Sequence, residues 1–239
     1  MQMSQLISSS IKRMFDIIAS GMAIIVLLPL YAIAAIGIEV SDSGPVFYMA
    51  KRVGKDNKIF RMFKFRSMRV DKSADEKNFK ADTNRIFKWG EFLRSTKIDE
   101  LPQLINVFLG QMSVIGPRPA SVDQIAVTRA GKYAIISSLK PGLSGPSALY
   151  DYIYGDQIED EDEYKEKVLP TRLDLDLYYI KAKCLSYDIK MIWYTLICIY
   201  SMIVKRYPQW MLDEFVEAAR TINVAGPHIN SDDTVSYRR

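Results

Sequence analysis

The segment between Asp16 and Glu39 contains no charged residue, and it constrains the fold more than any other part of the chain. At about 1.5 Å per residue, residues 17–38 form a helix long enough to cross the apolar part of a bilayer. Pro29 lies in the middle of this segment, where a proline removes one backbone hydrogen bond and clashes with the preceding turn. We therefore expect a membrane helix that is bent or broken near Pro29.

Basic residues flank this segment on both sides. They are Lys12 and Arg13 before it, and Lys51, Arg52, Lys55 and Lys58 after it. A helix that simply crosses a bilayer usually has one cation-poor side. The residues by themselves leave two topologies open: a kinked full span, and a re-entrant helix that returns to the face from which it entered.

A second apolar stretch, residues 191–204, is shorter and is bracketed by Lys190 and Lys205. Its length suits a helix in the membrane interface or in a protein core, and both alternatives remain open. After Trp210 the sequence becomes polar, and residues 230–239 are expected to be frayed.

Composition removes several classes of function. The net charge of +4, from 32 basic and 28 acidic residues, favours a small anionic substrate or an acidic lipid surface over nucleic acid. The single histidine, His228, lies in the polar tail. We therefore expect no Ser-His-Asp triad, no His/Cys zinc site and no histidine base. Cys184 and Cys198 match no metal or disulfide spacing, which predicts a reducing compartment.

The sequence predicts a β-hairpin from Phe47–Val53 and Ile59–Phe65, joined by a turn over residues 54–57. In the second strand, the period of two places Lys64 and Arg66 on one face. These two cations form either a phosphate-facing wall or an ordinary solvated face. Residues 71–82 are charged and are expected to form a loop or a short surface helix.

Two helices are expected next, over residues 85–94 and 101–109. In the second, apolar residues recur at intervals of three and four, Pro102 suits the first turn and Gly110 ends the helix. Asp99 is therefore placed at or next to the N-cap. An acid there is usually structural, but a cap needs only one acid and Glu100 follows immediately.

Cations near this acidic pair indicate phosphate chemistry with a metal ion. Arg118 lies between two prolines in residues 116–119, which restricts its backbone and presents its guanidinium to phosphate oxygens. Lys140 opens the glycine-containing segment 140–145, which is not a Walker-type loop. Arg94 precedes the acids by only a few residues.

A set of short motifs, read in order, resembles a known family. They are Gly44-Pro-Val-Phe-Tyr48, Arg52-Val-Gly54, Lys64-Phe-Arg-Ser-Met68, Asp99-Glu-Leu-Pro-Gln103, Asn106, Met112-Ser113, Gly116-Pro-Arg-Pro119 and Lys140-Pro-Gly142. Each motif is weak alone, but the ordered set is similar to bacterial sugar transferases, the small monotopic phosphoglycosyl transferases that act on polyprenyl phosphate. The resemblance runs from about residue 12 to residue 195.

The resemblance implies transfer of a sugar-1-phosphate from a UDP-sugar to undecaprenyl phosphate, with release of UMP. It implies Asp99 as the nucleophile that forms a covalent phosphosugar intermediate, with Glu100 assisting proton removal from the lipid phosphate. Asp99 and Glu100 would also bind Mg²⁺. The residues and the resemblance together nominate these substrate- or phosphate-binding residues: Lys64, Arg66, Arg94, Gln103, Arg118 and Lys140.

The expected fold is a mostly helical α/β protein with a small β-hairpin, monotopic in the membrane. The resemblance implies that the N-terminal helix is re-entrant, so we divide the chain into a re-entrant helix broken near Pro29 (1–40), a cytosolic catalytic domain with interfacial helices (41–206) and a polar tail (207–239). The expected location is the cytosolic face of the bacterial inner membrane, at the first membrane step of a surface glycan pathway. Expected partners are the lipid bilayer and the two substrates; a second copy and downstream glycosyltransferases are further candidates, and nucleic acid is not.

The chain departs from the family pattern at three places. Leu28 replaces a frequent serine before the membrane proline, Gln111 replaces a frequent acid, and residues 146–151 differ from the usual Trp/Ala/Gln pattern. The last difference leaves the donor sugar open. Two other functions are carried as alternatives: a phosphatase or pyrophosphatase that uses the same acids, and a non-catalytic membrane anchor of a glycan-assembly complex.

Overall fold

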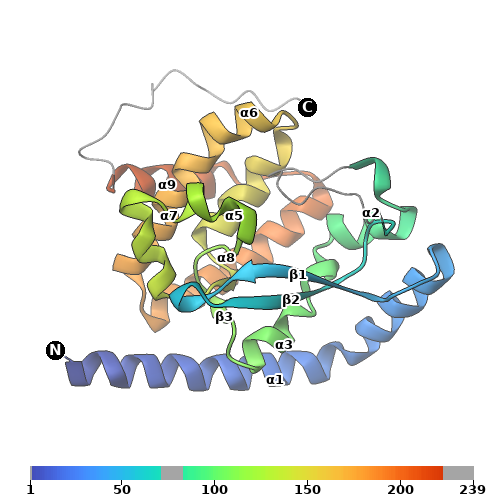
Figure 1. Cartoon of the computed structure of the whole chain (residues 1–239), viewed down its shortest axis with the longest axis horizontal. Coiled ribbons are helices and arrows are strands. Elements are labelled where there is room, and N and C mark those ends of the chain that lie inside the picture. Colours follow the sequence, from blue (N-terminus) through green and yellow to red (C-terminus); the bar gives the residue numbers. More distant parts are fainter. Residues whose placement is uncertain (1, 71–82, 223–239) are drawn as a thin grey trace.

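The computed structural model describes residues 2–70 and 83–222, with side chains from residue 9 onward. The predicted loop at residues 71–82 and the predicted frayed end at residues 230–239 lie outside the described residues. Figure 1 shows a helical body with a small sheet, lying on one side of a long N-terminal helix.

The N-terminal helix, α1 (Gln2–Ser41), is continuous through Pro29. Its ribbon bends toward the body in its C-terminal part (Figure 1), so of the two predicted effects of Pro29 a bend is seen and a break is not. Exposed apolar side chains recur along α1 at helical spacing: Ile11, Met14, Ile18, Met22, Ile25, Val26, Ile33, Ile36 and Val40. Within the described residues, α1 and α8 (Leu185–Val204) are long and apolar enough to cross a membrane, judged by length and composition alone.

The predicted β-hairpin is confirmed. β1 (Phe47–Val53) pairs antiparallel with β2 (Ile59–Phe65), with Phe47 opposite Phe65 and Val53 opposite Ile59. β4 (Ala120–Ser121) pairs with the other edge of β1, and β3 (Ser113–Ile115) pairs in parallel with β5 (Gly142–Ser144).

The short helices after β2 differ in extent from the prediction. α2 (Lys88–Ser95) starts three residues later than expected, and a 3-10 helix (Ile98–Glu100) and a turn precede α3 (Gln103–Phe108). Pro102 is therefore the N-cap of α3 and not part of its first turn, and Asp99 lies inside the 3-10 helix. A proline lacks the N–H that would continue a helical ladder from residue 98, so the chain makes two short helices in place of one.

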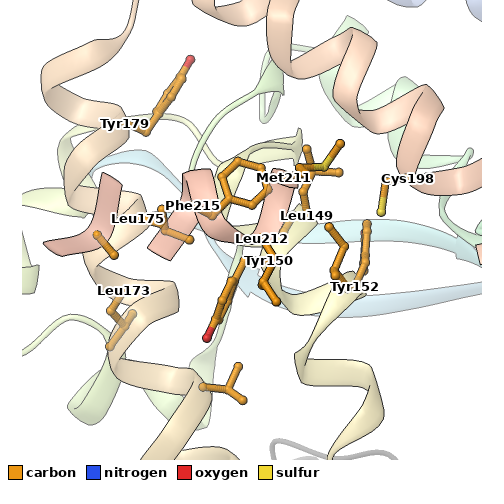
Figure 2. Packing of buried hydrophobic residues seen from close by; sticks show 14 of the residues in the cluster. Leu149, Tyr150, Tyr152, Leu173, Leu175, Tyr179, Cys198, Met211, Leu212 and Phe215 are labelled. Carbon is orange, nitrogen blue, oxygen red and sulfur yellow. The ribbon is translucent and has the colours of Figure 1, made fainter. Parts of the chain in front are cut away.

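The largest core lies among α5 (Pro146–Ile153), α7 (Leu169–Ala182), α8 and α9 (Gln209–Arg220). Figure 2 shows buried side chains of this core meeting between the helices, including Leu149, Leu175 and Phe215. The short α4 (Ile125–Thr128) and α6 (Glu161–Glu163) are the remaining α-helices of the described residues.

The sequence assigns α9 to the polar tail, yet its apolar side packs in this core. Met211, Leu212 and Phe215 are buried while Asp213 and Glu217 face out, so the low average hydropathy of the segment hides an amphipathic helix. In α8, Met191 and Cys198 are buried in the core, whereas other apolar side chains of the same helix are exposed. The helix is therefore partly a core helix and partly a surface helix, the two alternatives that its sequence left open.

Candidate active site

The acidic pair lies on the 3-10 helix between α2 and α3, at the junction of α1, β2 and α5. Lys97, the residue before this helix, has a left-handed backbone (φ 56°), which is uncommon for a residue with a side chain. On the other side of the pair, the Tyr31 hydroxyl donates a 2.7 Å hydrogen bond to the Leu101 carbonyl. The hydrogen bond from Tyr31 therefore ties the C-terminal side of the pair to α1.

Both carboxylate oxygens of Glu100 accept a hydrogen bond. Lys64 Nζ, from β2, donates to Oε1 at 2.8 Å, and the Tyr152 hydroxyl, from α5, donates to Oε2 at 2.8 Å. Burial acts to raise the pKa of Glu100, but the positive charges of Lys64, Lys97 and Arg118 outweigh it and hold that pKa well below its usual range. Glu100 is therefore an ionised, fixed acceptor.

Asp99 is in a different electrostatic state from its neighbour. Its side chain is buried, at 4% exposure, and burial raises its pKa to about 6, with Lys64 acting in the opposite direction and Glu100 adding to the rise. Its Oδ1 is buried and has no hydrogen-bond partner among the described residues. A buried carboxylate oxygen without a partner is costly, and it is the feature expected of an atom that meets a substrate or a metal ion.

Cations and an aromatic ring surround the pair. The Tyr152 ring centroid lies 3.9 Å from Lys97 Nζ and 5.5 Å from the Arg118 guanidinium carbon. Two aspartates outside the pair hold Arg118 in place: its Nε lies 3.2 Å from Oδ2 of Asp151, and its backbone N–H donates to Oδ1 of Asp176 at 3.2 Å. The site therefore presents fixed positive charge beside a partnerless carboxylate oxygen, an arrangement suited to phosphoryl groups.

The structure brings three of the predicted phosphate-binding cations to the pair. Lys64 contacts Glu100 directly, Arg118 lowers the pKa of Glu100, and Arg94 on α2 lowers that of Asp99. Gln103 is buried at the start of α3, in the helical turn that follows the pair.

Two predicted residues lie elsewhere. Arg66 donates to the Asp42 carboxylate and, at 2.6 Å, to the Pro45 carbonyl, so it ties the end of α1 to β2. Lys140 lies beside Arg13 of α1, and none of the contacts or charge interactions that the structure gives it involves the acidic pair. The period of two assumed that the strand continues to Arg66, whereas β2 ends at Phe65, so the partner of Arg66 is set by the packing of the end of α1. Substrate contacts by these two residues stay predictions.

Sequence reasoning missed Tyr152, Lys97 and Asp151. Tyr152 and Asp151 lie within or next to the segment 146–151, where the chain departs from the family pattern, and that departure was the one available signal. Nothing in the local periodicity shows that a tyrosine on α5 reaches a glutamate 52 residues earlier.

The residues present fit a magnesium ion. No group of three or more His, Cys, Asp or Glu side chains suited to a metal occurs in the described part of the chain. Mg²⁺ is commonly held by one or two carboxylates together with substrate phosphates and water, so a larger cluster is not required. Oδ1 of Asp99, which has no partner among the described residues, and the ionised carboxylate of Glu100 are oxygen donors of the kind this ion prefers.

Comparisons with known proteins show the family of the chain. A family model described as "Bacterial sugar transferase" matches residues 7–202. The chain is 37% identical over 188 residues to a UDP-glucose:undecaprenyl-phosphate glucose-1-phosphate transferase of Klebsiella pneumoniae, covering 77% of this chain and 39% of the relative. It is 36% identical to a UDP-N-acetylgalactosamine-undecaprenyl-phosphate N-acetylgalactosaminephosphotransferase of Aeromonas hydrophila, covering 78% of this chain and 43% of the relative.

A shorter relative matches over almost its whole length. The exopolysaccharide production protein PSS of Rhizobium leguminosarum bv. phaseoli is 34% identical over 199 residues, covering 78% of this chain and 94% of the relative. By contrast, the chain spans about two fifths of the length of the Klebsiella and Aeromonas relatives.

Proposed function

The chain belongs to the bacterial sugar transferase family, and we propose that it transfers a sugar-1-phosphate from a UDP-sugar to undecaprenyl phosphate, releasing UMP. One observation carries this proposal: Asp99 and Glu100 are adjacent but in different states. Glu100 is ionised with both oxygens occupied, whereas Asp99 presents a buried oxygen without a partner. A pair whose members differ in this way can divide the work between a nucleophile and a fixed acceptor.

In the first step, a carboxylate oxygen of Asp99 attacks the phosphorus that carries the sugar. A bond forms between this oxygen and phosphorus, the bond between phosphorus and the bridging oxygen breaks, and UMP leaves with that oxygen and its electron pair. In the second step, a phosphate oxygen of undecaprenyl phosphate attacks the same phosphorus and frees the Asp99 carboxylate. Splitting one displacement into two in this way is nucleophilic catalysis.

The surrounding side chains hold the charges that change during these steps. Lys64, Lys97 and Arg118 provide fixed positive charge for the phosphate oxygens, and Tyr152 and Lys64 keep Glu100 in position. When bound at Asp99 and Glu100, Mg²⁺ would add charge neutralisation at those oxygens. Because its pKa is held low, we assign Glu100 mainly to positioning; assistance in proton removal remains a prediction of the family resemblance.

The packing of α1 supports a monotopic position at the cytosolic face of the inner membrane. The body contacts α1 near its start, where Lys12 Nζ lies 2.5 Å from Asp188 Oδ2, and near its end, where Trp89 Nε1 donates to the Ala34 carbonyl at 3.3 Å. If α1 crossed a bilayer, these contacts would carry polar parts of the body into the hydrocarbon. A helix held along the body keeps its exposed apolar stripe in lipid and the body outside it, which suits insertion from one face; a full return of the helix to that face stays what the family resemblance implies.

The test uses the full chain in detergent with a panel of UDP-sugars. We expect UMP release with one sugar, together with an increase in intact mass equal to that of the sugar phosphate when the lipid acceptor is omitted. Asp99→Asn should abolish both, whereas Asp123→Asn, the same change at an exposed aspartate of the 3-10 helix before α4, should keep both.

The alternatives are distinguished by the same assay. Continued turnover of the UDP-sugar to UMP and free sugar-1-phosphate without a lipid acceptor would identify a pyrophosphatase, and further release of inorganic phosphate would identify a phosphatase. The absence of any turnover across the panel would favour a membrane anchor. Full activity of Asp99→Asn would overturn the assignment of the nucleophile.

A further inference from the structure

A surface hollow of about 530 Å³, open to solvent, lies between the N-terminal half of α1 and the loop before β5. One side is polar and basic, with Ser10, Arg13 and Lys140; the other is apolar, with Met14, Ile17 and Ile18. We call it the Arg13–Lys140 pocket. The proposed reaction uses none of these side chains.

The basic side of this pocket is built and not merely exposed. Arg13 donates at 2.7 Å to both the Val107 and Phe108 carbonyls, so its guanidinium is held at the end of α3. Lys140 is close to it: a Cβ placed on Gly110 would lie 3.1 Å from Arg13 Nη2 and 3.5 Å from Lys140 Nζ. Gly110 itself has φ of 84°, a conformation that favours glycine, and its lack of a side chain leaves room for both cations.

The two positive charges are only partly balanced by a carboxylate. Among the described residues, neither Arg13 nor Lys140 forms an ion pair, and burial followed by the Arg13 charge lowers the pKa of Lys140. The charge of Asp16 offsets part of that of Lys140, while Lys55 adds to the positive side, so Arg13, Lys140 and Lys55 outnumber the one acid. The pocket therefore offers a net positive charge to an anion.

The apolar side defines the rest of the occupant. Met14 and Ile18 belong to the exposed apolar stripe of α1, which continues through Met22 and Ile25 along the face turned away from the body. A free anion would leave this wall in water, whereas a ligand with a phosphate at one end and hydrocarbon at the other would cover both sides.

The pocket is separate from the acidic pair. The Arg13 guanidinium binds the Val107 carbonyl, and Val107 follows Asp99 by eight residues of largely helical chain, which is about 12 Å at 1.5 Å per residue. An anion bound at Arg13 is therefore not the phosphate that reacts at Asp99.

We propose that the Arg13–Lys140 pocket binds the headgroup phosphate of an anionic bilayer phospholipid, whose chains lie along the apolar stripe of α1. The site would fix how the N-terminal half of α1 sits in the membrane. The inference uses the membrane position of α1, which is part of the proposed function, but not the transfer reaction.

Native mass spectrometry of the full chain in detergent, with phosphatidylglycerol or phosphatidylcholine added in equal amounts, tests the proposal. The wild type should retain phosphatidylglycerol preferentially. A surface cation adds roughly fivefold to affinity for an anionic lipid, so Arg13→Gln with Lys140→Gln should lower the preference about 25-fold. Ser10→Glu should also lower it, while leaving the Arg13 hydrogen bonds to the α3 carbonyls intact.

A matched control removes the same charge elsewhere: Lys181→Gln with Lys183→Gln, two exposed lysines at the end of α7, should keep the preference. Equal retention of the two lipids by the wild type, or an unchanged preference in both pocket variants, would overturn the proposal. Displacement of the phospholipid by inorganic phosphate would reveal a simple anion site, and displacement by substoichiometric undecaprenyl phosphate an acceptor site; either result overturns it. Because no UDP-sugar is present, failure here is distinguishable from failure of the transferase assignment.

Discussion

The Tyr152 hydroxyl donates a 2.8 Å hydrogen bond to Oε2 of Glu100, and this bond joins the helical core to the acidic pair. Tyr152 is on α5, which is buried along its whole length, whereas Glu100 lies on a three-residue 3-10 helix that makes little core of its own. The rigid helix therefore positions the short one. Lys97, whose ammonium lies 3.9 Å from the same ring, adds a second contact between them.

Tyr152→Phe should slow formation of the phosphosugar adduct by about 10- to 100-fold, because a hydrogen bond to a charged group contributes roughly 1.5–3 kcal/mol. Quenched-flow intact-mass measurement would give the rate. Tyr150→Phe is the matched control: it also removes a buried hydroxyl from α5, but that hydroxyl bonds Thr171 and not the acidic pair. Equal rates for the two variants would show that Tyr152 does not position Glu100.

Asp99→Asn should stabilise the metal-free protein, and more so at neutral than at acidic pH. The pKa of Asp99 is raised from 3.8 to about 6, mainly by burial, so the folded state holds a proton that the unfolded state releases. The free energy of unfolding of the wild type therefore falls as pH rises from about 4 to about 6. For this group alone, the free energy of unfolding is lower by about 3 kcal/mol above pH 6 than it is below pH 4.

Unfolding midpoints in EDTA at pH 4.5 and pH 7.5 check this prediction. The difference between Asp99→Asn and wild type should be larger at pH 7.5, whereas the exposed control Asp123→Asn should show no such trend. A variant that is less stable than wild type at both pH values would contradict the proposed cost of burying Asp99.

Magnesium should raise the unfolding midpoint of the wild type, since a ligand that binds only the folded state stabilises it by mass action. The rise should be larger at pH 7.5 than at pH 5, because protonation of Asp99 competes with the metal ion. Sodium chloride at matched ionic strength is the control for screening. An equal rise in Asp99→Asn would place the ion elsewhere.

Asp16→Ala should loosen α1 from the body. The buried carboxylate accepts hydrogen bonds from Ser113 Oγ and the Val114 N–H, and removing it leaves both donors unpaired, at a cost of roughly 2 kcal/mol or more. Thermal unfolding and limited proteolysis within α1 would report the loss. Asp16→Asn keeps an acceptor oxygen and should lose less; if the two variants were equal, the hydrogen bonds would not be what holds the helix.

The sequence by itself determined the parts of this protein that depend on near neighbours. The period of two in residues 47–65 predicted the hairpin, the uncharged segment predicted a long apolar helix, and Pro29 predicted its bend. The adjacent acids and the proline-flanked Arg118 predicted the candidate site, because that prediction depends on residue types a few positions apart.

Only the tertiary structure decided which side chains meet. Lys64 and Tyr152 reach Glu100 from 36 and 52 residues away, and Arg66, one residue past the strand that carries Lys64, turned to Asp42 instead. The different states of Asp99 and Glu100 follow in the same way, since burial and neighbouring charge are properties of the packed site. Local periodicity fixes the direction of a side chain relative to its own helix or strand, but its partner is set by how distant elements pack, and no spacing along the chain encodes that.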